Sequence, residues 1–286
     1  MIEKSDIKLI KNIIEFINSN DKYNRLFKHH KQVYYIEDLL TALIYKLKTG
    51  ISYKNISNQK FNIKGGNLHY FHTKIIKYKL FENYYDNYIE NYILIMGNNI
   101  NNFFVDSTLV ANKLGIDKVT HNIQLKKHKS LKISIIEDEF KIPIDFIVSN
   151  SNYHDSSLML NHIENISKKY PSLCTNNKHF IADSAYDSEK IRIELKSKKL
   201  GDLICDRNKR NTKDPNKLIN LIPNLHHKLL LKKRSNIEHT NNSLKQNRTI
   251  NVRYEKKSKY YENFVLLAIM RNIFKKIGCI KNYNSK

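Results

Sequence analysis

The sequence predicts an α/β protein with two regions, an all-helical N-terminal region of residues 1–99 and a mixed α/β region of residues 100–286. Apolar residues recur at helical spacing before position 100. Short β-prone runs begin at Asn101, and from about residue 155 helical stretches alternate with further strands. The chain length suits two domains.

The N-terminal region begins with an amphipathic helix from Ser5 to about Ser19, which Ser5 or Asp6 would cap. A second helix is predicted from about Glu37 to Lys48, and Gly50 suits a left-handed helix stop. The segment TGISYKNIS should begin another helix, and more helical stretches lie between about Leu68 and Met96, after the Gly65-Gly66 break.

Three consecutive strands open the second region and fit an antiparallel meander. They are NNFFVD ending at Asp106, SLKISIIED ending at Asp138, and KIPIDFIV ending at Val148. The elements predicted after them are a helix at about 155–168, a strand ending at Asp183, a helix at 187–198, a strand ending at Asp206, and helices around 234–247 and 259–277.

The charge of the chain points to nucleic acid as the partner. Its 50 basic and 27 acidic residues give a net charge of +23 and a pI near 9.7, as expected of a protein that binds phosphates. A competing explanation is codon usage in an AT-rich genome, which inflates Lys and Asn. The sequence has no apolar run of membrane-spanning length and no signal peptide, so we expect a soluble, intracellular, DNA-associated protein with no membrane partner.

Three carboxylates form the candidate site. Asp106 and Asp183 each close a predicted strand, where side chains project into the crevice that holds ligands in α/β sheets. Glu238 lies on a predicted helix and shares one face with Arg234 and Lys245. Grouped carboxylates repel one another unless a cation neutralises them. Oxygen ligands favour Mg²⁺ or Mn²⁺, and two such ions about 3.5–4 Å apart serve phosphoryl transfer.

The segments FFVDST, SIIEDEFKIPIDFIV, NYHDSSLM, HFIADSAYDS and RSNIEHTNNSLKQNRTINVRYE resemble DDE transposases of bacterial insertion sequences, most closely the families numbered four and five. This resemblance implies an RNase H-like catalytic fold and assigns Asp106, Asp183 and Glu238 as catalytic, metal-binding acids. It also implies cut-and-paste transposition on double-stranded DNA, with the element's terminal inverted repeats and the target as substrates. A homodimer or larger synaptic complex would hold the two ends.

The family signature around the last acid is Tyr, two residues, Arg, three residues, Glu, six residues, Lys. This chain matches it at Arg234, Glu238 and Lys245 but has Leu231 in place of the Tyr. The match implies that Arg234 and Lys245 contact DNA phosphates.

Further basic residues flank the predicted site and could form the walls of a DNA channel. They are Lys126, Lys127, Lys129, Lys232, Lys233, Arg248, Arg253, Lys256 and Lys257. Reading of the element's ends requires base contacts, for which the helical region 1–99 is the better candidate. Lys48–Asn58 is a weak match to the turn of a helix-turn-helix motif.

Several other residues have simpler interpretations. Asp187 is expected to cap the following helix. Glu137, Asp138 and Glu139 lie at a predicted hairpin turn and are expected to be solvated.

Two classes of function remain open. The first is an active transposase with metal-dependent strand cleavage and strand transfer. The second is a domesticated, catalytically inactive DNA-binding protein. A related enzymatic alternative is an RNase H-like nuclease without strand transfer.

Overall fold

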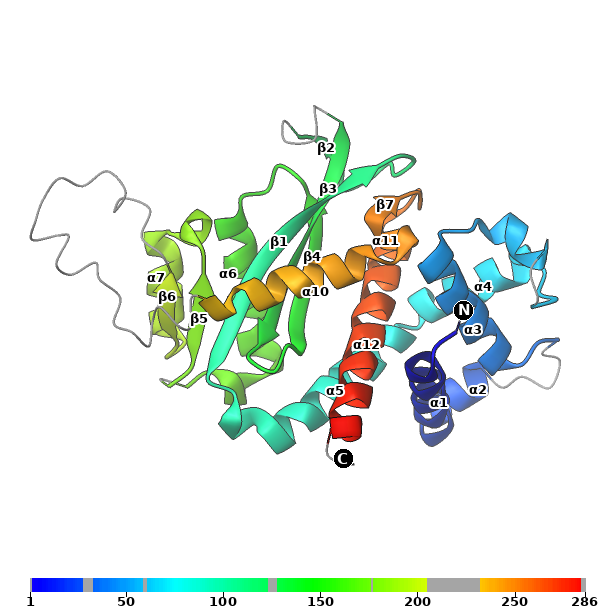
Figure 1. The fold of residues 1–286 in the computed structure, drawn as a ribbon, viewed down its shortest axis with the longest axis horizontal. Helices are drawn as coiled ribbons and strands as arrows, with labels where there is room; N and C mark the ends of the chain where they lie inside the picture. The colour runs from blue at the N-terminus through cyan, green and yellow to red at the C-terminus, as the bar shows by residue number, and fades with distance from the viewer. Residues whose placement is uncertain are drawn as a thin grey trace, which may run out of the picture. The chain divides into compact units, whose positions relative to one another are not determined.

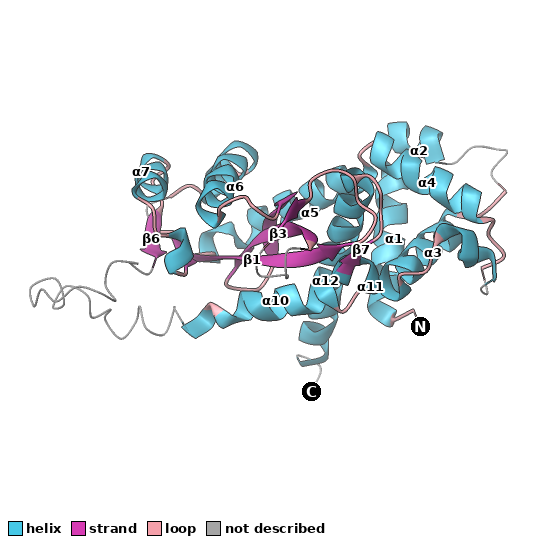
Figure 2. Cartoon of the chain, turned by 90° about the horizontal axis from the view of Figure 1, so that it is seen from above, coloured by secondary structure: helices cyan, strands magenta, loops and turns pink. Residues whose placement is uncertain are grey.

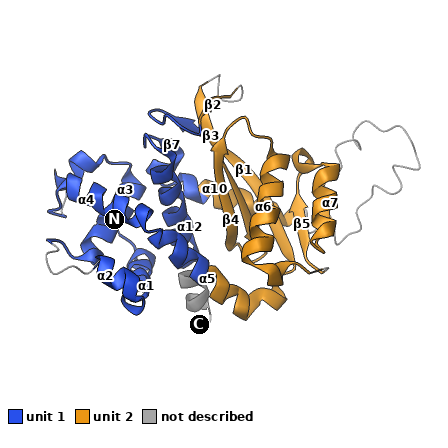
Figure 3. Cartoon of the chain, turned by 180° about the vertical axis from the view of Figure 1, so that it is seen from behind, with its two compact units in different colours: residues 1–88, 110–118, 243–286 blue, residues 89–109, 119–242 orange. Residues whose placement is uncertain are grey.

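The computed structural model describes residues 2–27, 33–58, 61–122, 128–175, 177–204 and 232–283. The chain forms two compact units (Figure 3). The first unit contains Met1–Tyr88, Val110–Lys118 and Ser243–Lys286, and the second contains Ile89–Leu109 and Val119–Asn242.

The first unit is mainly helical (Figure 1). Its elements are α1 (Lys4–Ser19), α2 (Asp21–Phe27), α3 (Ile36–Thr49), the 3-10 helix η1 (Tyr53–Asn58), α4 (Gly65–Lys77), most of α5 (Leu80–Met96), α11 (Arg248–Asn251), strand β7 (Val252–Arg253) and α12 (Ser258–Tyr283). Gly50 ends α3 at φ +70°, as predicted. In the ranges given above, no helix is long and apolar enough to cross a lipid bilayer.

The segment TGISYKNIS forms only η1 rather than an α-helix. Residues 50–64 separate α3 from α4, whereas the turn of a helix-turn-helix spans about 3–4 residues. The structure therefore does not support Lys48–Asn58 as such a turn.

A buried ion pair joins the two ends of the chain within the first unit. Arg271 on α12 donates from Nε to Asp6 Oδ1 at 2.5 Å and from Nη2 to Glu3 Oε1 at 2.7 Å. Asp6 is fully buried. Its Oδ2 also accepts a hydrogen bond from the backbone N–H of Glu3, the N-cap residue of α1, at 2.8 Å. The N-cap of α1 is thus Glu3 rather than the predicted Ser5 or Asp6. Asp6 lies inside the helix, where its carboxylate completes a capping box with Glu3 and also binds α12. The functional division at residue 99 stays a prediction.

The second unit is built on a mixed sheet. Its strands are β1 (Asn102–Asn112, which continues into the first unit), β2 (Thr120–His121), β3 (Lys129–Asp138), β4 (Pro143–Asn150), β5 (His179–Ala182) and β6 (Gly201–Ile204). The strand order is β4-β3-β1-β5-β6, with β2 also on β3. Strands β3 and β4 pair antiparallel, whereas β1, β5 and β6 pair parallel. This order confirms the predicted RNase H-like mixed sheet.

Helices cover the sheet on both faces (Figure 2). Helices α6 (Asp155–Lys169) and α7 (Glu189–Ser197) lie on one face, and α10 (Ser235–Lys245) runs along the other. The remaining elements are the 3-10 helices η2 (Gly97–Asn99), η4 (Pro171–Leu173) and η5 (Ser184–Tyr186). The predicted strand ending at Asp206 is β6, of which Cys205 and Asp206 lie outside the described residues.

Two predictions about acidic side chains are wrong. Glu137 and Asp138 are fully buried rather than solvated. Asp138 accepts hydrogen bonds from the hydroxyl of Tyr92 and from the backbone N–H groups of Phe140 and Ile142. Asp187 does not cap α7, whose N-cap is Ser188; its carboxylate instead pairs with Arg192 at 2.9 Å.

We expect Arg271→Leu to lower the free energy of unfolding by about 3 kcal/mol, because it leaves the buried Asp6 carboxylate without its main partner. Lys168→Leu, which breaks the exposed pair with Glu164, should cost less than about 1 kcal/mol. Urea unfolding of both variants measures the difference. Equal losses of stability in the two variants would show that burial does not strengthen the Arg271–Asp6 pair.

Burial raises the pKa of Asp138 from 3.8 to about 6. The folded protein then binds this proton more tightly than the unfolded chain does, so the group favours folding at low pH. Its contribution, on the order of 3 kcal/mol, is present below about pH 4 and lost as the pH rises through about 6. We expect the stability difference between wild type and Asp138→Asn to change over that window in urea titrations. A difference that is constant with pH would contradict this assignment.

Candidate active site

The pairing of β1 with β5 places Asp106 and Asp183 beside each other. Phe104 is paired with Ile181 in the parallel register, and each aspartate lies two residues further along the chain. Because side chains alternate between the faces of a strand, each aspartate follows its apolar partner on the same face. Asp183 comes directly after β5, as predicted, whereas Asp106 lies inside β1, which continues to Asn112. The prediction that Asp106 closes its strand is therefore wrong.

Helix α10 packs beside this pair, with Ile237 as its apolar contact. Ile237 is fully buried in a cluster with Phe104 and Ile181, and Leu203 lies at its edge. Glu238 is the next residue. Each of the three predicted acids thus lies within two residues of the same small apolar cluster.

The surroundings of Asp106 are partly buried and polar. Its Oδ2 accepts a hydrogen bond from Asn241 Nδ2 on α10 at 2.9 Å. Burial raises the pKa of Asp106 above its ordinary value, and the negative charge of Asp183 adds to the rise. The hydrogen bond from Asn241 and the positive charge of Arg234 oppose it. The two aspartates are therefore close enough to repel each other.

Glu238 is oriented toward Arg234 rather than toward the aspartates. Its side chain is 51% exposed, and its Oε1 accepts from Arg234 Nη2 at 3.1 Å. Arg234 also acts on Asp106, so its positive charge influences two of the three acids.

The donor set suits a divalent metal only in part. Carboxylate oxygens are the ligands that Mg²⁺ and Mn²⁺ prefer, and mutual repulsion gives Asp106 and Asp183 a reason to bind a cation. In the described part of the chain, however, no three His, Cys, Asp or Glu side chains are grouped closely enough to hold a metal ion. The structure brings Asp106 and Asp183 together, and Glu238 would have to turn away from Arg234 to join them.

The predicted DNA contacts are exposed, lie outside the described residues or, in the case of Arg253, are buried. Lys129, Lys232, Lys233 and Arg248 are exposed, and Lys245 lies partly exposed in the last turn of α10. Lys126 and Lys127 lie outside the described residues, as does Leu231.

Arg253 requires a correction, because it is fully buried. Its guanidinium donates to the backbone carbonyls of Asp117, Glu255 and Lys256 and to the Asp117 carboxylate. It therefore holds a loop together in the first unit and does not face DNA.

Sequence reasoning missed two polar residues on the sheet-facing side of α10. Asn241 binds Asp106, and Thr240 donates to Glu137 Oε2 at 2.6 Å. Both continue the helical stripe that starts at Ile237. The sequence could have indicated them, because polar residues on a helix face that packs against the sheet are buried, and buried polar groups need hydrogen-bond partners.

A mixed sheet with two adjacent aspartates and a glutamate on a covering helix defines a candidate carboxylate site for phosphoryl transfer. Comparison with known families agrees, because residues 100–273 match the model described as Transposase DDE domain. The chain belongs to this family. No curated protein matches the chain. One solved structure that does is the crystal structure of a pre-cleavage Mos1 transpososome, at 9% identity and a TM-score of 0.29, covering 92% of this chain and 83% of that one.

We expect Ile237→Ala to lower the free energy of unfolding by about 2–4 kcal/mol and to speed amide exchange in α10, because it empties the cluster with Phe104 and Ile181. Ile193→Ala on α7, where the side chain is 61% exposed, should change stability by less than about 0.5 kcal/mol. Hydrogen exchange read by mass spectrometry locates the effect. Unchanged protection of 235–242 would mean that Ile237 does not hold the helix.

Proposed function

We propose that the protein is a DNA transposase that cleaves and joins strands at the ends of an insertion-sequence element by a cut-and-paste route. The observation that carries the proposal is the common anchoring of Asp106, Asp183 and Glu238 on one apolar cluster. Family membership supports it, since the matched region contains all three acids.

In this proposal Asp106 and Asp183 hold Mg²⁺ or Mn²⁺, with Glu238 as the third ligand. The ions, two in the simplest scheme, would supply Lewis acidity and an activated attacking hydroxyl. Asn241 orients Asp106 by its hydrogen bond, so that the remaining oxygen lone pairs face the site. Arg234 exchanges its carboxylate partner for a DNA phosphate, which a guanidinium can bind with two hydrogen bonds.

Substrate binding is assigned to the basic surface and to the N-terminal helices. Lys129, Lys232, Lys233, Lys245 and Arg248 would contact the phosphates of double-stranded DNA, the terminal inverted repeats and the target. Lys126 and Lys127 are proposed for the same role. Residues 1–99 would recognise the ends, and a homodimer or larger synaptic complex would hold two of them.

The test is cleavage of a duplex that carries the element's own end, with Mg²⁺, Mn²⁺ or EDTA. We expect metal-dependent nicking by the wild type, and a loss of at least about 100-fold in Asp106→Asn, Asp183→Asn and Glu238→Gln, since even outer-shell changes at metal sites cost about 10–100-fold. Glu194→Gln is the matched control for Glu238, because Glu194 also forms an i,i+4 pair, with Lys198 at 3.6 Å.

DNA binding is measured separately on the same variants. Wild-type protein that binds ends without cutting them would identify an inactive DNA-binding protein. Cutting without joining of the freed 3′-hydroxyl to a target duplex would identify a nuclease that lacks strand transfer.

A further inference from the structure

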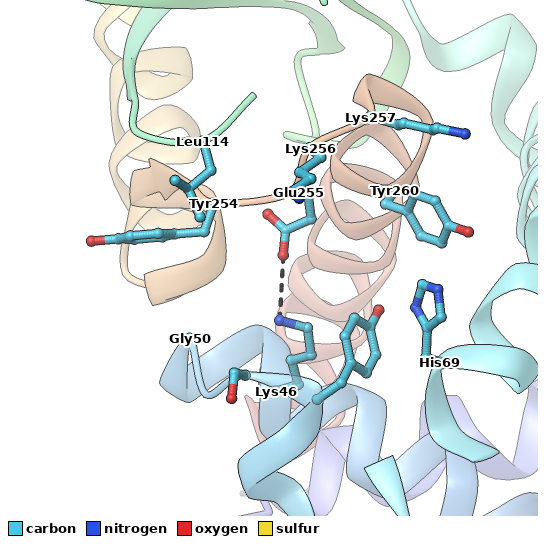
Figure 4. A pocket seen from close by; sticks show the side chains of 11 residues that line it. Lys46, Gly50, His69, Leu114, Tyr254, Glu255, Lys256, Lys257 and Tyr260 are labelled. Carbon is cyan, nitrogen blue, oxygen red and sulfur yellow. Dashed lines mark hydrogen bonds and ion pairs between the residues drawn. The ribbon is translucent and has the colours of Figure 1, made fainter. Parts of the chain in front are cut away.

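A cavity of about 550 Å³ lies within the first unit, apart from the acid triad (Figure 4). This volume is in the range of sites for small molecules. The end of α3, helices η1 and α4, the start of α12 and the loop around Glu255 supply its walls. The buried guanidinium of Arg253 fixes that loop by binding the carbonyls of Glu255 and Lys256.

Glu255 gives the cavity an unused hydrogen-bond acceptor. Its side chain is only 8% exposed, and Oε1 pairs with Lys46 Nζ at 3.3 Å. Its other oxygen, Oε2, is buried and has no hydrogen-bond partner among the described residues. Figure 4 shows this oxygen directed to the side where Tyr254 and Leu114 lie. A buried acceptor without a donor is unfavourable, so a ligand with an N–H group would stabilise it.

The surrounding charges restrict what that ligand can be. Lys46, Lys256 and Lys257 line the same cavity, and the last two are exposed. Three ammonium groups against one carboxylate repel a metal ion or a simple amine. They favour a molecule that is anionic overall and still carries a neutral N–H donor.

Aromatic side chains restrict the shape of the ligand. Tyr254 is 54% exposed and lines the cavity, and Leu114 lies on the same side of Glu255. On the other side, His69 stacks on Tyr260 with ring centroids 5.2 Å apart and planes at 23°. Exposed tyrosine rings stack on planar bases without regard to sequence.

We propose that this cavity binds a nucleotide whose base carries an exocyclic amino group. The amino group donates to Glu255 Oε2, the base lies against Tyr254, and the phosphate binds Lys256, which lies next to Glu255. Cytosine and adenine present such a donor, whereas thymine presents a carbonyl oxygen at the same place. The one N–H of the thymine ring, at N3, lies between two carbonyl oxygens, which the carboxylate repels. The nucleotide is either an unpaired position of a DNA strand or a free nucleotide.

The first experiment measures binding of dAMP, dCMP and dTMP to the full chain by calorimetry. We expect dAMP and dCMP to bind at least about tenfold more tightly than dTMP, the effect of one unsatisfied buried group. Equal affinities, or no binding of any nucleotide at millimolar concentration, would overturn the proposal.

Two variants separate recognition from folding. Glu255→Gln supplies an amide N–H₂, so we expect the preference against dTMP to shrink or invert. Tyr254→Ala should weaken all three nucleotides by about tenfold and leave their ranking unchanged. Tyr153→Ala, at a tyrosine that is 49% exposed in the second unit, is the control and should change neither. A Tyr254→Ala variant that binds nucleotides as tightly as the wild type contradicts the stacking role. If Glu255→Gln does not fold, the preference of the wild type for dAMP and dCMP over dTMP still tests the role of the carboxylate.

A second arm identifies the source of the nucleotide. Duplexes with one unpaired adenine, one unpaired thymine or no unpaired base are compared by fluorescence anisotropy. Tighter binding of the unpaired adenine than of both others supports a DNA position, whereas discrimination among free nucleotides alone supports a free nucleotide. Neither arm uses cleavage, so Asp106→Asn should retain the binding even if the proposed transposase activity fails.

Discussion

The contact of Phe104, Ile181 and Ile237 is the constraint on which the candidate site depends. The pairing of β1 with β5 sets Phe104 and Ile181 in register with each other, and the burial of Ile237 holds α10 against them. Carboxylates cannot hold themselves together, because their charges repel. Burial of the apolar side chains one or two residues away, which does not depend on charge, holds the carboxylates near one another instead. The acids are thus placed by their neighbours and left free to interact with a cation.

Cations from the chain itself pair with acidic side chains in both units. Arg234 binds Glu238 and opposes the rise in the pKa of Asp106, and Arg271 neutralises Asp6 in the first unit. The two cases differ in accessibility. Arg271 and its partner Asp6 are both buried, so this pair is structural, whereas Glu238 is half-exposed and can exchange its partner.

The sequence predicted the order of helices and strands well, because apolar periodicity and the end signal at Gly50 are local properties. Of the three acids, the structure brings Asp106 and Asp183 together, whereas the catalytic role of Asp106, Asp183 and Glu238 stays a prediction. It could not predict that Glu137 and Asp138 are buried, since a hairpin turn is normally exposed and their partners Thr240 and Tyr92 are far away in the chain. The burial of Arg253 has a similar cause: its positive charge is visible in the sequence, but its partner Asp117 becomes a neighbour only in the fold.

The placement of the acids by adjacent anchors also bears on how this chain can evolve. Between Asp106 and Asp183, and between Asp183 and Glu238, the chain is long, yet none of that length sets the spacing of the three carboxylates. Insertions or deletions in these connections change loop-closure entropy only slowly with length. A change in the length of the chain between one acid and the next can therefore leave the acids in register, provided that each keeps its apolar neighbour.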